Sequence, residues 1–517
     1  MAITAGTSRR PDTEGAVRPP VRAVVPTGGG PGPRPPRSGP TGPGHRTVAA
    51  RAALRRRLRT TVPARLHLLR AATVLPATAL AALLLVAGLA AGGTWSSVAG
   101  RDAPRTTSAA DLDLALNDMD AQAANMLLAN GDGGRGRLQT PYGKAVGLYG
   151  DARRRIGHDL RTLAVAAQGA RGDERTVESL TDDFAEYQEL VGRALESDGR
   201  VGGKADALVE YRQATDLLRG QLLPESRKLV DSNNRAFDAE YGAARSALSA
   251  QLAAVLALGL LLLVLLGGLQ WYLARSFRRV LNPGVLAATA CTLLAVVLGT
   301  EMLSATSGDL RGARRDAFDS VVALSRARAI AYDANADESR YLLDPQRRDR
   351  YARAFLAKSQ ELYGTKGATL SSYDSRLATS WQAYRTDHHD LRFTGEYRRE
   401  LDNITFPGER AAAERTVEAY AVYQRDDRRI RALLAAGKER EAVEFCMGWE
   451  PGTSNAHFGA YMAALDKVTD INRAHFASAV GEGRSAVSAV LPWAVGLLFA
   501  AVVLTALGLR PRLAEFR

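Results

Sequence analysis

The sequence has very little cysteine. Cys291 and Cys446 are the two cysteines among 517 residues, and they fall in different segments of the chain. No disulfide can therefore form within either of the two long polar segments, 93–250 and 306–485. Patterns typical of β-strands are nearly absent as well. The chain must gain its stability from the packing of helices.

Catalytic motifs are also missing. There is no glycine-rich phosphate loop, no cysteine pair and no nucleophile motif. The best metal-like cluster is 387–390, Asp-His-His-Asp, but adjacent residues on a helix point about 100° apart and cannot converge on one ion. We interpret it as a solvated helix face. The sequence predicts a protein that is not an enzyme, with no cofactor and no metal.

Four stretches are apolar for about twenty residues each, long enough to cross a hydrocarbon core. None has a charged residue near its centre, which disfavours ion or proton transport. The polar segments between them become two separate helical domains on one side of a bilayer. The predicted spans are 71–92, 251–273, 284–305 and 486–509.

Arginine marks the cytoplasmic ends of spans, because positive flanks resist translocation. Residues 1–70 hold 14 Arg against two acids, Asp12 and Glu14. The link 274–283 and the tail 510–517 are also basic. Both termini are therefore predicted in the cytoplasm, the polar segments outside, and the chain in the cell membrane as a multi-pass protein. The leader 1–70, rich in Pro and Gly, is predicted to be disordered.

The formal charge of +13 does not indicate nucleic-acid binding. Residues 93–249 hold 20 bases and 24 acids, and residues 306–485 hold 28 and 27, so the external segments sum to −3. The excess of positive charge is a topology signal and an attraction to anionic membrane lipids.

Each external segment is predicted to be an antiparallel helical bundle. In the first, Leu112, Leu116 and Met119 begin one apolar stripe, and the helix breaks at 131–134. Further helices cover 141–169 and 174–197, and a fourth runs from Lys204 into the second span. Pro224 should kink that fourth helix. The result is an up-down-up-down four-helix bundle.

The second segment follows the same plan with more material. Its first helix rises from the third span and breaks at Asp344-Pro345, and residues 346–402 are less regular. The last helix enters the fourth span, with Ser454 or Asn455 as its N-cap. The two segments also resemble each other locally: Asp-Ala-Gln-Ala from Asp120 matches Asp-Ala-Asn-Ala from Asp333. A duplicated unit of span, bundle and span can build a pseudo-dimer from one polypeptide.

Arginines rise along the helices of the second segment, at Arg326, Arg328 and Arg340 and again within 425–431. One interpretation is a crevice for an acidic metabolite. The favoured one is surface pairing with Asp426, Asp427 and Glu338 on solvated faces.

The layout suits signalling, because a helix continuous from an external bundle through the bilayer transmits displacement. The link and tail are too short to fold, so the output is expected to pass to a separate protein. The candidate output residues are Arg275, Phe277, Arg278 and Arg279.

Three stretches make the chain resemble the GlnX-type membrane transducers: ALSRARAIAYDANADESRYLLDP at 323–345, AYAVYQRDDRRIRALL at 419–434 and LLRGQLLPESRKLVDSNN at 217–234. The external segments also resemble four-helix-bundle chemoreceptor sensors. The family resemblance implies a relay. An extracellular lipoprotein binds aspartate or glutamate, the transducer spans the membrane, and a protein kinase G type serine/threonine kinase adjusts nitrogen and central carbon metabolism.

Three hypotheses follow: this relay, a receptor that binds a small molecule directly, and an envelope scaffold. A homo-oligomer stays open in each. In the relay, the turns farthest from the membrane contact the lipoprotein. The candidate contact residues are Gly131, Asp132, Asp344, Pro345, Trp449, Glu450 and Pro451.

Overall fold

The computed structural model describes residues 62–277 and 281–514. Residues 1–61 of the leader, Arg278, Arg279 and the last three residues of the tail lie outside that description, as does the side chain of Phe277. Within the described part, the chain forms helices and two isolated bridges but no β-strand. The predicted all-α fold is confirmed.

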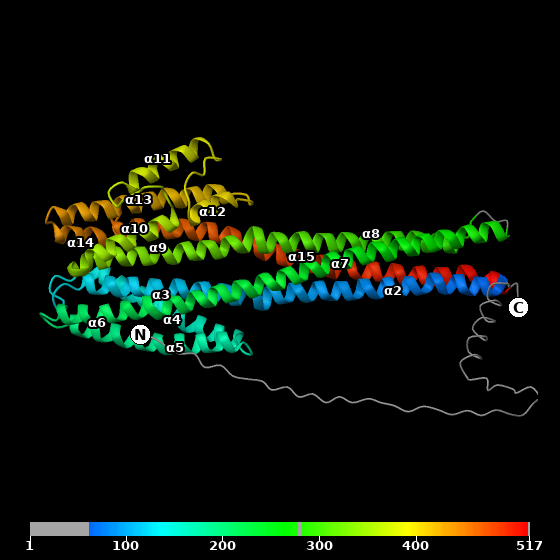
Figure 1. Cartoon of the computed structure of the whole chain (residues 1–517), viewed down its shortest axis with the longest axis horizontal. Helices are drawn as coiled ribbons and strands as arrows, with labels where there is room; N and C mark the ends of the chain where they lie inside the picture. The colour runs from blue at the N-terminus through cyan, green and yellow to red at the C-terminus, as the bar shows by residue number, and fades with distance from the viewer. Residues whose placement is uncertain (1–61, 278–280, 515–517) are drawn as a thin grey trace, which may run out of the picture. The chain divides into compact units, whose positions relative to one another are not determined.

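The first half of the chain leaves its first apolar rod, makes three turns between helices and returns along its second apolar rod (Figure 1). Its loop boundaries fall close to the predicted ones, with the first break directly after Ala129. The helices are α2 (Val62–Ser97), η1 (Val98–Asp102), α3 (Ala103–Ala129), α4 (Gln139–Ala166), α5 (Arg171–Asp198), α6 (Lys204–Leu217), η2 (Leu218–Leu222) and α7 (Leu223–Phe277).

The second half repeats this path with additional short helices. Its first rod ends at Leu343, directly before the predicted break at Asp344-Pro345. The helices are α8 (Pro283–Arg311), η3 (Gly312–Phe318), α9 (Asp319–Leu343), η4 (Pro345–Arg347), α10 (Arg348–Leu362), α11 (Tyr373–Thr386), α12 (Glu396–Asp402), α13 (Glu409–Ala435), α14 (Glu439–Met447) and α15 (Ser454–Ala514).

Four helical rods in the described chain are long and apolar enough to cross a membrane. They extend well beyond the apolar windows, so each span is continuous with a helix of a polar bundle. The chain is an all-α membrane protein. The rods are Ala64–Ala129, Lys204–Ser276, Pro283–Leu343 and Ser454–Pro511.

Small residues let these rods approach closely inside the membrane. A Cβ added to Gly299 of α8 would lie 2.6 Å from Leu84 Cδ2 of α2, and one added to Gly88 of α2 would lie 2.6 Å from Leu491 Cδ2 of α15. Large apolar side chains point outward, as expected of surfaces that lipid covers. They include Val86, Leu89, Leu260, Val264, Leu293, Phe499 and Leu507.

π-helical turns interrupt three of the rods outside the predicted spans. η1 and η3 occupy matching places in the two halves, each between a span and the ascending helix of its bundle. η2 directly precedes α7, in which Pro224 is the second residue. Proline has no N–H to donate to the preceding turn, and the wider π turn accommodates that loss. The irregularity predicted at Pro224 is therefore present as a π turn.

The two predicted bundles are in contact. One hydrophobic cluster extends from the first bundle into part of the second, and the second bundle also has a separate cluster of its own, which includes Tyr420 and Tyr461. Leu342 and Leu343 of α9, Ile430 of α13 and Phe445 of α14 belong to the same buried cluster as Leu116 and the other core residues of the first bundle. The ascending helices α3 and α9, which carry the matching Asp-Ala-Gln-Ala and Asp-Ala-Asn-Ala sequences, pack on each other. The two halves pack against each other within one chain, as a pseudo-dimer would.

This packing also corrects the expectation of a single apolar stripe on α3. From Leu112 to Asn130 every residue of the chain is buried, polar ones included. The stripe that begins at Leu112 faces its own bundle, and the opposite face of α3 is covered by α9. A helix buried on all sides needs polar partners for its polar residues, and α9 supplies several of them.

The start of the last helix differs from the prediction by one or two residues. α15 begins at Ser454, and the N–H of His457 donates to the carbonyl of Thr453 at 3.1 Å. Thr453 therefore occupies the cap position predicted for Ser454 or Asn455. The Ser454 hydroxyl points inward and donates to Glu338 Oε1 at 3.1 Å.

Candidate functional site

The turns at the end of the bundles remote from the spans are held together by hydrogen bonds; we call this end the distal end. Asp132 Oδ1 accepts from the N–H of Gly202 at 2.8 Å, joining the turn after α3 to the turn after α5. Asn130 donates to Asp198 Oδ2 at 2.7 Å across the same junction. Gly131 has φ +73°, a left-handed conformation that lets the chain reverse sharply. The two turns thus form one structured surface.

The turn after α9 is fixed to the first half by ion pairs. Arg212 of α6 donates through Nε to Asp344 Oδ2 at 2.8 Å, and Arg347 pairs with Asp216 at 3.3 Å. The structure places Asp344 in the interior, with 1% of its surface exposed, whereas Pro345 beside it is exposed. Asp344 therefore holds the turn in place, and Pro345 is the residue that a partner protein can reach.

Trp449, Glu450 and Pro451 form the turn between α14 and α15. Lys144 of α4 lies 4.3 Å from the centre of the Trp449 ring, a cation–π contact between the two halves. Glu450 and Pro451 are exposed, and Trp449 is half-buried. This turn combines an aromatic ring with charge at a place that solvent reaches.

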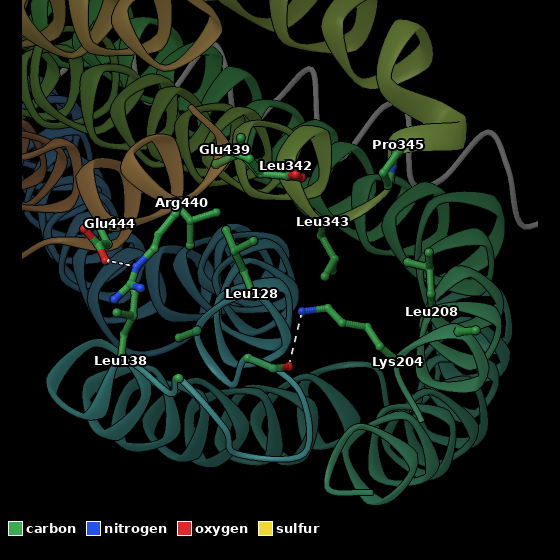
Figure 2. A pocket seen from close by; sticks show the side chains of 15 residues that line it. Leu128, Leu138, Lys204, Leu208, Leu342, Leu343, Pro345, Glu439, Arg440 and Glu444 are labelled. Atoms are coloured by element: carbon green, nitrogen blue, oxygen red, sulfur yellow. Dashed lines mark hydrogen bonds and ion pairs between the residues drawn. The ribbon is translucent and has the colours of Figure 1, made fainter. Parts of the chain in front are cut away.

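A crevice of about 540 Å³, the distal crevice, opens between the two halves at this end (Figure 2). Figure 2 shows Lys204 extending between Leu128, Leu208 and Leu343, with Nζ 3.5 Å from the carbonyl of Gly131. Most of the residues that line the distal crevice are apolar, and a few charged side chains lie among them. Its lining includes Leu128, Gly131, Leu138, Lys204, Leu343 and Pro345.

The charges of the distal crevice come from both halves. Lys204 belongs to α6, whereas Glu439, Arg440 and Glu444 belong to α14. Arg440 and Glu444 form an ion pair at 2.8 Å, visible in Figure 2 near Leu138. An apolar cleft with separate positive and negative groups is suited to an amphipathic segment of a protein partner.

Beneath the distal crevice lies a buried ion network that the sequence interpretation missed. Arg340 of α9 pairs with Asp120 of α3 and with Asp337 Oδ1, the latter at 2.6 Å. Arg340 and Asp337 are 1% and 0% exposed, and Asp120 is 0% exposed. Tyr187 donates to Asp120 Oδ1 at 2.8 Å. Arg340 therefore does not lie on a solvated face: it joins the two halves in the core.

Two further cations complete the network. Lys358 Nζ of α10 lies 2.6 Å from Asp333 Oδ1, and Arg219 Nη2 of η2 lies 3.3 Å from the same oxygen. Both cations also pair with Asp337. Three carboxylates, Asp120, Asp333 and Asp337, thus face three cations, Arg340, Lys358 and Arg219. A balanced set of this kind lowers the cost of removing each charge from water.

Two opposing effects set the pKa values of the network: burial disfavours the charged form of each group, and a nearby opposite charge favours it. Burial lowers the pKa of Arg340 to about 10, which still leaves the guanidinium charged at neutral pH. Burial also lowers the pKa of Lys358, against the attraction of Asp333 and Asp337. For Asp333, burial raises the pKa, but Lys358 and Arg219 outweigh it and the net shift is downward.

The sequence contains a pattern that indicates this network. Asp333, Asp337 and Arg340 recur at spacings of four and three, so they share one face of α9. Asp113, Asn117 and Asp120 do the same on α3. Polar residues at core spacing on two matching helices indicate a polar interface. Arg340 and Asp120 lie 220 positions apart, and Arg219 and Asp333 lie 114 apart, so these pairings could not be assigned from the sequence.

Other predicted site residues lie apart from the distal end. Arg275 is exposed near the end of α7, 5.9 Å from the ring of Trp271, while Phe277, Arg278 and Arg279 fall where no side chain is described. Residues 387–390 form a turn after α11 and not a helix face, which corrects the earlier interpretation. His388 there pairs with Glu414 at 3.3 Å. Across residues 62–277 and 281–514 no metal-binding group of side chains is found.

Comparison with known proteins identifies one similarity. Residues 94–242 match the family described as actinobacterial sensor domain. The match covers the first bundle and less than half of the chain. No curated protein and no solved structure matches. Together with the four apolar rods, the similarity indicates a membrane protein with a role in sensing or signalling.

Proposed function

We propose that the chain is a transmembrane signal transducer of the GlnX type. Its distal end contacts an extracellular solute-binding lipoprotein that detects an acidic amino acid. Its cytoplasmic side passes the state of that complex to a soluble serine/threonine kinase that controls nitrogen and central carbon metabolism. The chain itself catalyses nothing in this scheme. The similarity of residues 94–242 to a sensor domain supports the sensing half of the proposal.

The proposed orientation places both termini in the cytoplasm and both bundles outside. It is supported by the basic residues that flank the cytoplasmic ends of the spans. Arg275 beside Trp271 fits a membrane interface, where an aromatic ring and a cation reach the lipid headgroups together. The hydrophobic cluster that joins the two bundles supports placing both on the same side of the membrane.

The observation that carries the proposal is the junction of α3 and α9 above the membrane. Each helix continues through a π turn into a span. Because the buried pair of Arg340 and Asp120 fastens α3 to α9, a force applied at the distal end acts on both rods. Rigid rods convert such a force into a shift, tilt or rotation at the other face of the membrane.

The surface proposed for the lipoprotein consists of the distal crevice and the turn 449–451. It offers an apolar cleft, an accessible aromatic ring and charges of both signs, the composition of a protein interface centre and rim. Of the predicted contact residues, Gly131 and Pro345 line the distal crevice, and Asp132 holds the adjoining turn.

Substituting Trp449 and Glu450 by alanine should abolish capture of the lipoprotein by the purified chain. The change leaves the backbone carbonyl of Glu450, which accepts from Thr453, in place. Loss of an aromatic anchor costs about 2 kcal/mol or more, roughly thirtyfold in affinity. Mass spectrometry after affinity capture in mild detergent identifies and quantifies the lipoprotein.

The matched control is Arg392→Ala, in the turn after α11, where the side chain is 82% exposed and pairs locally with Asp390. This variant should capture the lipoprotein as well as the wild type does. Equal capture by the Trp449 and Glu450 variant, or the lack of any solute-binding lipoprotein bound to the wild type, would contradict the proposal.

A further inference from the structure

A second and smaller cavity lies between the two halves, closer to the membrane. It has a volume of about 200 Å³ and is bounded by α3, α7, α9 and the end of α10. We call it the lateral crevice. Pockets for drug-sized ligands have volumes of about 300–1,000 Å³, so this one suits a small metabolite. Its polar lining residues are Asp113, Arg227, Asp231, Asn234, Arg326 and Glu361.

Asp113 is the unusual member of this lining. The residue is 8% exposed, and within the described chain its Oδ1 has no hydrogen-bond partner. The nearest cation, Arg227 Nε, lies 3.8 Å from that oxygen, beyond hydrogen-bond distance. A buried carboxylate oxygen without a donor is costly, and native proteins rarely leave one unpaired without a functional reason.

The remaining groups supply the opposite charge. Arg227 and Arg326 belong to α7 and α9, and their side chains are 58% and 62% exposed, so both guanidinium groups can turn toward a bound anion. Arg326 Nε lies 3.5 Å from Glu396 Oε1, an ion pair without a hydrogen bond. Guanidinium groups bind carboxylates with two parallel hydrogen bonds.

We propose that the lateral crevice binds a small α-amino acid directly, with the ammonium group on Asp113 and the carboxylate on Arg227 and Arg326. The zwitterion supplies the missing donor to the orphaned oxygen and an acceptor to the two arginines, whereas a simple cation or anion would satisfy one side only. This site goes beyond the proposed function, because it requires no lipoprotein.

Ligand binding in the lateral crevice would act on the rods that carry the signal. Asp113 belongs to α3, Arg227 to α7 and Arg326 to α9, so one bound molecule bridges three rods from both halves. If a ligand binds more tightly to the conformation with one spacing of these rods than to the conformation with another, it shifts the protein toward the first conformation.

The test is calorimetric titration of the full chain in lipid nanodiscs with L-α-amino acids from glycine to glutamate. At least one should bind, while ethylamine and acetate should bind at least about tenfold more weakly. Asp113→Asn should weaken binding by about tenfold or more, which corresponds to about 1.4 kcal/mol. Asp182→Asn, on an exposed face of α5, should leave binding unchanged. Absence of binding by every amino acid, or equal binding of ethylamine, would overturn the proposal.

Thermal unfolding of the same variants separates loss of the site from loss of the fold. Burial raises the pKa of Asp113 to about 6, against the effect of Arg227. An ionised carboxylate whose pKa is raised in the folded state destabilises it above that pKa. Asp113→Asn should therefore raise the melting temperature of the free protein while it weakens binding. A variant that melts lower and still binds would overturn the assignment.

The pH dependence has a defined sign. The groups that face Asp113 are Ser226, Arg227 and Asp231 from α7, Arg326 and Asp333 from α9, and Glu361 from α10. Asp113 holds an ammonium only when ionised, so affinity should fall as the pH drops through about 6. Affinity that is unchanged between pH 7 and pH 5 would contradict a role for this carboxylate. None of these results depends on capture of the lipoprotein.

Discussion

Arg340→Met should destabilise the protein more than any surface substitution. The side chain is 1% exposed and neutralises Asp120 and Asp337, both fully buried. Removing one partner from a buried ion network leaves charges unpaired in a medium of low dielectric constant, at a cost of about 3–5 kcal/mol. Thermal unfolding of the full chain in detergent, followed by intrinsic fluorescence, measures the loss as a lower melting temperature.

Two further variants assign the loss to charge. Adding Asp120→Asn to Arg340→Met removes the carboxylate that loses its cation, whereas Asp337 keeps Lys358 and Arg219, so the double variant should melt above the single one. Arg154→Met removes a cation that is 72% exposed and pairs locally with Asp151, and it should change little. If Arg340→Met melted like the wild type, the network would not hold the two halves together.

Gly483→Ala should be the second severe substitution. Gly483 lies on α15 directly against the ring of Trp95 from α2, and an added Cβ would overlap the indole. Trp95 is 0% exposed, so the ring has little room to move. Overpacking of a tight interface costs about 1–3 kcal/mol. The separation of two rods would also change, so lipoprotein capture and thermal unfolding should both be measured.

Gly481 provides a control two residues away on the same helix. No described atom outside its own helix lies within 4 Å of a Cβ at that position. Because alanine favours helix over glycine by about 0.5–1 kcal/mol, Gly481→Ala should be neutral or slightly stabilising. Equal behaviour of the two variants would show that α2 and α15 are not in close contact beside Trp95.

The shared core changes how the two halves can transmit a signal. Two independent bundles would each move their own pair of spans. Here Leu343 and Phe445 of the second half are buried with Leu116 of the first, and Arg340 pairs with Asp120. A contact at the distal crevice therefore acts on the rods of α3 and α9 together. The π turns η1 and η3 are the points at which the rods depart from regular geometry between this core and the membrane.

Local sequence patterns were sufficient to predict the long helices and the positions of the main breaks between them. The apolar stretches predicted the spans, and the breaks after Ala129 and at Asp344-Pro345 follow from glycine and proline chemistry. The short helices of 346–402 could be anticipated only as an irregular region, because their limits depend on contacts such as the paired bridge of Gly364 and Thr394.

The contacts between the two halves could not be predicted from the sequence. Asp344 seemed available to a partner, but Arg212, from the other half, buries it in an ion pair. Arg340 seemed to belong to a solvated face because its partner, Asp120, lies in the other half. Long-range pairing of this kind is set by three-dimensional packing and has no local pattern. The sequence also could not predict that Asp113 Oδ1 has no hydrogen-bond donor, because this depends on the groups that surround it in the structure.

The most direct test is to locate both bundles relative to the membrane by cysteine labelling. In a background with Cys291 and Cys446 replaced by alanine, Glu189→Cys and Arg392→Cys place exposed thiols on the first and second bundle, and Ser276→Cys places one at the end of α7. A membrane-impermeant maleimide should label the first two in intact cells and the third only after permeabilisation. Labelling of Glu189→Cys and Arg392→Cys from opposite faces would contradict a shared core on one side of the membrane.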